Sequence, residues 1–360
     1  MISTAILRER IKGGEVLSGL DLRGAVLDGL DLAGAVLEKC DLGGASLVRA
    51  NLSDSRISEC RLHGSDWRGA DITQCAFFRC DLSQAYLQDT ACRDTSFVEC
   101  QAAQADFRGV SLPACNFVQA GLAGARFDKA VFDQGSVSEC VLEHTSFAGA
   151  RFSKTLFFRA DLRSARLQQA QLEHVAFVEA DFTGQVLAGQ VLSGCQFIDA
   201  RMDGCDLRNA RLAQANFKGA SLRGAKLAGV HAPHALFVQA DLSQADATGA
   251  RLAQSMWPDA CLDGAVLSGA DLTQSVLHRA RCAAVRLDGA QLVYTDFSYA
   301  DLRDADLRQA QFQRTQMHRA LLDGARWSTR DGILPNDPAL YEAELWSARR
   351  GPAAADIHRP

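Results

Sequence analysis

The side chains that could carry out chemistry in this sequence are its histidines, its cysteines and its paired carboxylates. The eight histidines are scattered, and the closest pair, His231 and His234, has no thiol or carboxylate beside it at the spacing of a metal site. Asp301 and Asp306 could form an acid–base pair, but aspartate recurs at the same point of a repeated pattern throughout the chain. The sequence contains no glycine-rich phosphate loop. We therefore expect no catalytic residues, no metal site and no cofactor.

The repeated pattern has a strict period of five residues. Every fifth residue from Leu17 to Trp327 is apolar, and a small residue, usually Ala or Cys, stands two positions before it. Five matches neither the 3.6-residue period of a helix nor the two-residue period of a strand. It suits a short extended step followed by a corner, for which the glycine common two positions after the apolar residue gives backbone freedom. A fixed period over this length predicts a solenoid of stacked repeats.

A longer period of 20 residues sets the size of one coil. Like side chains stack best directly above one another, so a 20-residue recurrence implies four five-residue units per coil. At a strand spacing of about 4.8 Å, roughly 16 coils would form a rod on the order of 75 Å long. The phenylalanines expected to stack on one inner wall are Phe77, Phe97, Phe117, Phe157, Phe177, Phe197, Phe217, Phe237 and Phe297.

Three stretches, ADLRSA at Ala160–Ala165, ADLSQA at Ala240–Ala245 and ADLRDADLRQA at Ala300–Ala310, resemble the A(D/N)Lxx pattern of the pentapeptide-repeat family. The resemblance implies an all-β fold, a right-handed quadrilateral β-helix, which we expect over residues 15–327. Residues 1–14 are expected to form an N-terminal capping helix, and residues 328–360 a C-terminal helix and a disordered tail. The opening, Ile6–Leu32, also resembles the start of pentapeptide-repeat proteins associated with bacterial type VI secretion.

Two kinds of irregularity interrupt the pattern. Gln185 and Gln190 replace small residues at two successive inward positions and would need buried hydrogen-bond partners. Pro113, Pro233 and Pro258 lack a backbone donor, so we expect ladder hydrogen bonds to be absent there. We interpret all five as local repairs rather than as binding sites.

Composition indicates a soluble cytoplasmic protein. The net charge is −5 and charges of both signs are interspersed. Arg8, Glu9 and Lys12 stand where a signal peptide would need an apolar run, and no apolar run reaches membrane-spanning length. Of the twelve cysteines, all but Cys261 occupy inward positions, where cysteine acts as a small hydrophobe. The spacing of stacked cysteines does not exclude disulfides, but we expect reduced thiols and surface labelling at Cys261.

The strongest functional signal lies at the outward position directly after each fifth apolar residue. On the wall with the phenylalanine column, only Ser138 and Lys218 interrupt a row of apolar residues about 38 Å long. Alternatively, β-branched residues simply suit a flat sheet, but then other walls should carry them too, and there only Val48 and Val293 occur. An exposed apolar strip is typical of an interaction surface. The predicted protein-binding residues, which we call the ridge, are Phe78, Val98, Val118, Phe158, Val178, Ile198 and Val238.

Two functions remain open. The first is a non-catalytic interaction scaffold or adaptor of a bacterial cytoplasm, which would bind a secretion-related protein or a second copy of the chain through the ridge or the C-terminal helix. The alternative, implied by the family resemblance, is a DNA mimic that inhibits or protects DNA gyrase, a type II topoisomerase. Duplex DNA of the same length would carry on the order of 44 charges, whereas this chain nets −5. We favour the scaffold, and expect it to contact neither nucleic acid nor membrane.

Overall fold

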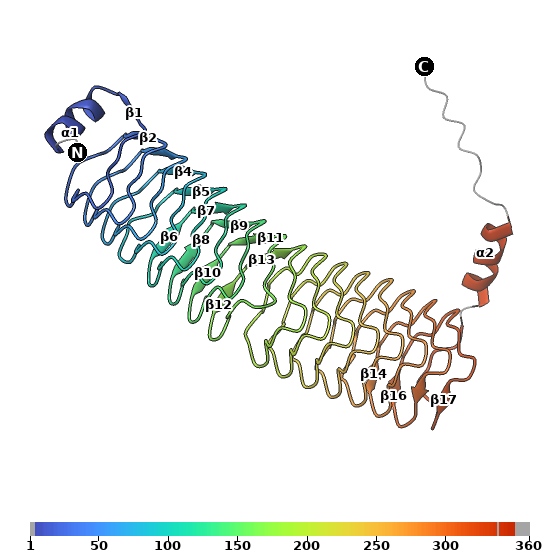
Figure 1. The fold of residues 1–360 in the computed structure, drawn as a ribbon. Helices are drawn as coiled ribbons and strands as arrows, with labels where there is room; N and C mark the ends of the chain where they lie inside the picture. The colour runs from blue at the N-terminus through green and yellow to red at the C-terminus, as the bar shows by residue number, and fades with distance from the viewer. Residues whose placement is uncertain (1–3, 337, 350–360) are drawn as a thin grey trace, which may run out of the picture.

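A computed structural model describes residues 4–336 and 338–349 of the chain. The chain winds into a four-sided parallel β-solenoid, seen as a bent rod in Figure 1, with helix α1 (Thr4–Lys12) at its start and helix α2 (Pro338–Arg349) after its last coil. Paired residues stand 20 positions apart, from Val16↔Val36 near one end to Asp306↔Arg326 near the other. The predicted β-helix with four five-residue units per coil is therefore confirmed.

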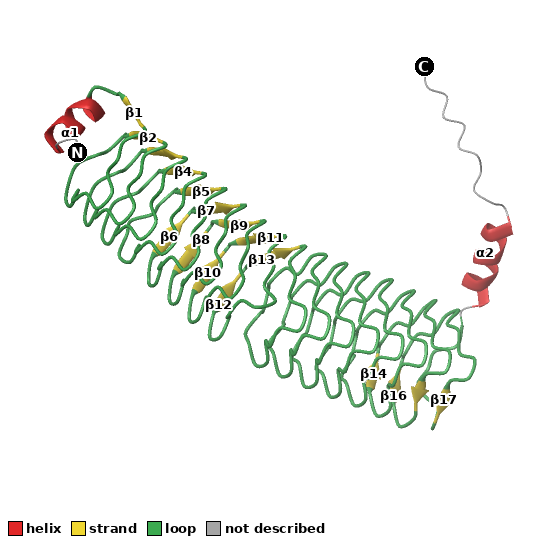
Figure 2. Ribbon diagram, in the orientation of Figure 1, coloured by secondary structure: helices red, strands yellow, loops and turns green. Residues whose placement is uncertain are grey.

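Two neighbouring walls contain regular sheets over part of their length (Figure 2). One holds a nine-stranded parallel sheet, which we call the Phe sheet, in the order β1-β2-β3-β4-β5-β7-β9-β11-β13. The other holds a four-stranded sheet, which we call the polar sheet, in the order β12-β10-β8-β6. Two smaller sheets pair β14 with β16 and β15 with β17.

The strands are two or three residues long, because each wall of a coil holds a single five-residue unit. Their bounds are β1 Val16–Ser18, β2 Val36–Glu38, β3 Arg56–Ser58, β4 Ala76–Phe78, β5 Ser96–Val98, β6 Ser111–Pro113, β7 Asn116–Val118, β8 Val131–Asp133, β9 Ser136–Ser138, β10 Arg151–Ser153, β11 Leu156–Phe158, β12 Gln171–Glu173, β13 Ala176–Val178, β14 Gln291–Val293, β15 Asp306–Leu307, β16 Gln311–Gln313 and β17 Arg326–Trp327. Elsewhere the walls are built from isolated bridges and turns in the same 20-residue register.

The phenylalanine column forms as predicted. Phe77 and Phe97 stack with their ring centroids 5.0 Å apart and their planes 10° apart, and Phe97 and Phe117 stack at 4.8 Å and 8°. All three side chains are buried. Because coil spacing and ring spacing agree, identical aromatic residues fill the wall without gaps and contribute both buried apolar area and ring contacts.

The small inward position tolerates serine, threonine and cysteine because its side chain can reach the coil before. Thr95 Oγ1 donates to the carbonyl of Ile72 at 2.7 Å, and Thr145 Oγ1 donates to the carbonyl of Leu122 at 2.8 Å. In both pairs the acceptor lies 23 residues earlier. Each polar group is thus buried with a partner, which removes the penalty of leaving it unsatisfied.

The corners of the coil have left-handed backbone, as the glycine pattern predicts. Gly109 has φ 71°, and Gln104 adopts φ 58° at the equivalent corner of the unit before it. Aspartate before the inward residue stabilises many corners. Asp306 accepts hydrogen bonds from the backbone N–H and the guanidinium of Arg308, and this side-chain bond lowers the pKa of Asp306 to about 2.

Pro233 and Pro258 lie in turns and do not interrupt the ladder, so the prediction is wrong at these two prolines, whereas at Pro113 it stays a prediction. The carbonyl of Pro113 accepts from Asp94 N at 3.0 Å, and those of Pro233 and Pro258 accept from the coil before at 2.9 Å. In turn-type coils the N–H of this outward position takes no part in the ladder between coils. Pro113 lies in β6, the edge strand of the polar sheet, where a missing donor is tolerated.

Helix α1 lies at the start of the rod, where Leu7 and Ile11 are buried and join the core. Its end is closed by Gly13 N donating to Glu9 O, followed by Gly14 with φ 70°. The predicted disordered tail, residues 352–360, lies outside the described residues. None of the described helices combines the length and the apolar character needed to cross a bilayer.

Candidate interaction surfaces

The ridge residues all point outward. Five of them are the last residues of strands in the Phe sheet, and the register aligns Phe78 with Val98, Val98 with Val118 and Phe158 with Val178. Ser138 of β9 completes this straight row between Val118 and Phe158. Ile198 and Val238 lie beyond the sheet, in turns. The ridge is therefore one row of side chains, carried by strands at its first five residues and by turns at Ile198 and Val238.

The ridge is less exposed than the sequence suggests. Phe78 is 36% exposed, and the other six ridge residues are half-buried. Stacked neighbours cover one another, and each phenylalanine also lies under the arginine that follows it. The guanidinium carbons of Arg79 and Arg159 stand 4.7 Å from the ring centroids of Phe78 and Phe158. Such cation–π contacts cover one ring face and leave the other available.

Strand geometry alone does not explain the ridge. The polar sheet has the same parallel, 20-residue register, and Phe132 and Phe152 are paired in its interior. Its outward residues at the ridge position are, in contrast, Pro113, Asp133, Ser153 and Glu173. At the ridge position, apolar outward residues are therefore concentrated on one wall, whereas at the position before each inward residue the wall of the polar sheet also exposes Val131 and Val191.

Sequence reasoning missed apolar residues on the other side of the inward phenylalanines. Leu156, 36% exposed, begins β11, and Leu236, 38% exposed, lies two positions before Val238. Both belong to the wall of the ridge and widen it at those coils. The same count of apolar residues, applied to the position before each inward residue, could have found them.

A column of charged residues lies beside the ridge. Arg79 Nε pairs with Glu99 at 2.7 Å, and Arg159 pairs with both Glu179 at 2.8 Å and Glu139 at 3.4 Å. These ion pairs bridge neighbouring coils on the solvent side of the wall. An apolar strip with a polar border has the layout of protein–protein interfaces, in which a rim surrounds an apolar centre.

The second candidate surface is an opening in the ladder between two coils. On the wall of the ridge the ladder is intact, since Phe177 N donates to Gln196 O at 2.6 Å. On the two walls that hold residues 166–174 and 186–193, no backbone hydrogen bond between those two segments is found in the described chain. Figure 1 shows the coils spreading apart after β12, and the rod bends there.

The two inward glutamines occupy this opening. Gln185 Nε2 donates to the carbonyls of Leu162 at 2.5 Å and Ala165 at 2.7 Å, and Gln190 Nε2 donates to the carbonyl of Leu167 at 2.9 Å. The prediction that both side chains need hydrogen-bond partners is therefore confirmed. The half-buried side-chain amides of both glutamines thus donate hydrogen bonds to backbone carbonyls of the preceding coil.

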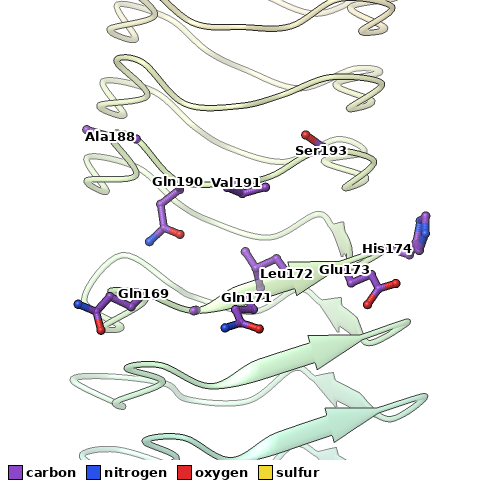
Figure 3. Close-up of a pocket in the computed structure, with 11 residues that line it drawn as sticks. Gln169, Gln171, Leu172, Glu173, His174, Ala188, Gln190, Val191 and Ser193 are labelled. Carbon is purple, nitrogen blue, oxygen red and sulfur yellow. The ribbon is translucent and has the colours of Figure 1, made fainter.

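The opening forms a cavity of about 750 Å³ (Figure 3). Its floor is β12 with Leu172 and Glu173, and its roof is the segment that carries Val191 and Ser193. In Figure 3 Gln190 points from the roof toward the coil of β12. Volumes of this size are typical of ligand sites.

Helix α2 is attached to the wall of the ridge at the end of the rod. Glu344 accepts hydrogen bonds from Tyr299 and from Arg319 at 3.0 Å, and His318 Nε2 lies 3.1 Å from it. The hydrogen bond from Tyr299 is the main cause that lowers the pKa of Glu344. The Arg319 guanidinium also lies 5.0 Å from the ring centroid of Tyr341. This cluster could not be predicted from the sequence, because Glu344 and Tyr341 lie in α2, outside the repeat.

Polar groups elsewhere serve the fold. Among the described residues no cluster of three or more His, Cys, Asp or Glu could hold a metal ion. The twelve cysteines are free thiols, of which only Cys261 is not fully buried. Burial raises the pKa of Cys75 to about 12, so this thiol stays protonated and unreactive at neutral pH.

The family model described as Pentapeptide repeats matches residues 16–134, 136–173, 191–255 and 260–324. The unmatched stretch 174–190 contains both inward glutamines. The comparison with curated proteins found no match.

Similar solved structures include HetL, a pentapeptide repeat protein involved in heterocyst differentiation regulation from the cyanobacterium Nostoc sp. strain PCC 7120. It is 23% identical, with 93% of this chain and 100% of HetL covered and a TM-score of 0.17. Another is trypsin-treated QnrB1, a plasmid-mediated fluoroquinolone resistance protein, which is 20% identical, with 65% and 96% covered and a TM-score of 0.22.

Proposed function

The chain belongs to the pentapeptide-repeat family, and we propose that it is a non-catalytic scaffold or adaptor that binds a protein partner through the ridge. The family is one of interaction proteins, and the described residues bring together no metal-binding cluster. We further propose a bacterial cytoplasmic setting with a secretion-related partner or a second copy of the chain. The resemblance of residues 6–32 to type VI secretion-associated members supports the secretion-related partner.

The observation that carries this proposal is the contrast between the two sheets at the same outward position. From β4 to β13 the Phe sheet presents Phe78, Val98, Val118, Phe158 and Val178 there, with Ser138 between them. Strands β1 to β3 carry Ser18, Glu38 and Ser58, and the polar sheet presents proline, carboxylates and serine. Stacked neighbours cover these side chains only in part, so apolar area remains exposed in the rod itself. A partner that covers them would remove their apolar area from water and gain about 25 cal/mol for each Å².

The test is association with and without charges in the ridge. Phe158→Asp with Ile198→Asp should abolish the pull-down of a partner and any self-association seen by light scattering, because both charges would be buried unpaired in the contact. The matched control is Ser153→Asp with Ala213→Asp, which adds the same charges on the wall of the polar sheet. Unchanged association of the ridge variant, or equal loss in the control, would overturn the proposal.

A further inference from the structure

Three basic residues follow one another in a single outward column, on the wall of the polar sheet but beyond its edge strand β12. They are Arg211, His231 and Arg251, which we call the basic strip. The register stacks them directly, because parallel bridges join Arg211 to His231 and His231 to Arg251. All three side chains are exposed. No other outward column between residues 16 and 327 contains three successive basic residues.

The arginines of the basic strip serve no purpose within the rod. In the part of the chain that the structure describes, neither Arg211 nor Arg251 forms an ion pair or donates a side-chain hydrogen bond. On the opposite wall an arginine of the same outward phase, Arg201, pairs with Asp181 of the preceding coil at 2.8 Å. The stacked column lacks such pairs and adds repulsion whenever His231 is protonated. An anion supplied from outside the chain therefore explains the strip better than the fold does.

The backbone beneath the basic strip is fully paired, so a partner meets side chains only. Leu212 N donates to His231 O at 2.7 Å, and Ala232 N donates to Arg251 O at 2.8 Å. These ladder bonds leave no free edge to which a strand could be added. A partner must therefore be recognised through its side chains.

Small residues lie directly beside the basic strip. Ala213, Pro233 and Ala253 each stand two positions after a strip residue, point outward and are half-buried. None of them carries a charge or a long side chain, so this part of the wall is flat. A straight, rigid element can therefore lie along the wall in contact with the strip.

Carboxylates limit the basic strip on both sides. Asp271 follows Arg251 in the same column, and Glu173 is the outward residue two coils before Ala213. The strip spans two coil steps, about 10 Å. A long polyanion such as a nucleic acid, with a charge at every phosphate, would meet these carboxylates. A short acidic segment of a protein fits between them.

The coil spacing matches an α-helix laid along the rod. Helix residues i, i+3 and i+7 share one face and lie at heights of about 0, 4.5 and 10.5 Å. The strip residues lie at about 0, 4.8 and 9.6 Å. Side chains on one face of an extended strand recur about every 6.7 Å and would fall out of step.

We propose that the basic strip docks an α-helix of another protein that carries Asp or Glu at i, i+3 and i+7. Arg211 and Arg251 pair with the two outer carboxylates, and a ring N–H of His231 donates to the middle one. Ala213, Pro233 and Ala253 let the helix approach. The site lies on a different wall from the ridge, and its partner does not depend on the partner proposed for the ridge.

The test is binding of a labelled, stapled helical peptide, acetylated and amidated, with glutamates at i, i+3 and i+7. Its affinity for the full chain is measured by fluorescence anisotropy at low salt. Arg211→Gln with Arg251→Gln should weaken binding about tenfold, since exposed ion pairs are individually weak. The matched control, Arg56→Gln with Arg166→Gln, removes two exposed arginines from other walls and should change the affinity less than about twofold.

Further probes separate the alternatives. A stapled peptide of the same composition with glutamates at i, i+5 and i+10, spread around the helix, should bind more weakly because only one glutamate can face the strip. A single-stranded DNA oligonucleotide should bind no better than this peptide. Ser153→Asp with Ala213→Asp, the control variant for the ridge, should keep ridge association but weaken the first peptide, because Ala213→Asp places a carboxylate beside Arg211.

Four outcomes would overturn the inference. They are no saturable binding of the first peptide, equal binding of the two peptides, equal loss in the Arg56→Gln with Arg166→Gln control, and tighter binding of the oligonucleotide that is lost with Arg211→Gln and Arg251→Gln. The last would assign the strip to nucleic acid instead.

Discussion

The Phe sheet and the polar sheet are built alike inside and differ outside. Both are parallel, keep a register of 20 residues and bury stacked phenylalanines, such as Phe157 with Phe177 and Phe132 with Phe152. Outward, the first carries an apolar row and the second carries Asp133, Ser153 and Glu173. The interior is set by the demands of stacking, whereas the outer face is open to variation. Function in this rod therefore has to be sought in the outward residues and in breaks of the repeat.

The largest expected effect tests the likeness of the two interiors. Phe157→Ala and Phe152→Ala should each destabilise the rod by about 3–5 kcal/mol, because each leaves a cavity in a stacked column. Thermal unfolding of both variants measures this. A much smaller loss at either position would show that the two walls are not equally packed.

The next effect tests the difference between the exteriors. Phe158→Ala should lower stability far less than Phe157→Ala, within about 1 kcal/mol, because outward residues away from the core have small effects. Thermal unfolding of this pair of neighbouring residues measures the contrast. Equal losses would show that Phe158 packs into the core.

The attachment of α2 to the wall of the ridge should depend on pH. The pKa of Glu344 is lowered in the folded chain, so its contribution is present above the ordinary glutamate range and is lost as pH falls through the lowered pKa. The protection factors of residues 338–347 against hydrogen exchange, which are corrected for the intrinsic pH dependence of exchange, should therefore fall on acidification. Tyr299→Phe should shift this fall to higher pH, and Glu342→Gln, on the same helix, should not. Protection factors of α2 that are independent of pH would contradict the role of Glu344.

The charged column beside the ridge should affect stability least. Arg159→Gln removes ion pairs to Glu139 and Glu179, but exposed pairs contribute little, so the melting temperature should hardly change. Its effect should appear in the salt dependence of partner binding, because rim charges steer association. Identical salt dependence of binding in wild type and variant would show that the charged column is not part of the interface.

No inhibition of gyrase is expected. Carboxylates such as Asp206 and Asp301 are paired with arginines two residues on at 2.6 Å, so the surface lacks the unpaired rows of charge that duplex DNA presents. A supercoiling assay at low micromolar protein should show full gyrase activity. Clear inhibition would favour the DNA-mimic function over the scaffold.

Most of the fold could be predicted from the sequence, because one physical constraint repeats in every unit. Every fifth residue must be apolar to line the coil, and Phe77, Phe97 and Phe117 recur at the length of one coil. The same five-residue period shows that the ridge side chains, each directly after an inward residue, point outward. Which coils form strands and which form turns could not be predicted, since both conformations place the same residue inward.

The remaining features depend on distances that a repeat pattern does not contain. Gln185 and Gln190 were visible as exceptions, but the opening they hold depends on side-chain length relative to coil spacing. The prediction failed at Pro233 and Pro258 because the sequence does not show which backbone N–H groups enter the ladder. Glu344 meets Tyr299 across 45 residues with no shared period, so only the structure brings them together.

The central claim is that the ridge, and not the polar sheet, contacts a partner. A photo-crosslinking residue placed at Val118, at the centre of the ridge, tests it against the same residue at Asp133, the equivalent position of the polar sheet. In cells that produce the protein, irradiation should join one protein to the Val118 variant and none to the Asp133 variant. Crosslinks of equal yield from both positions, or from Asp133 alone, would contradict the account.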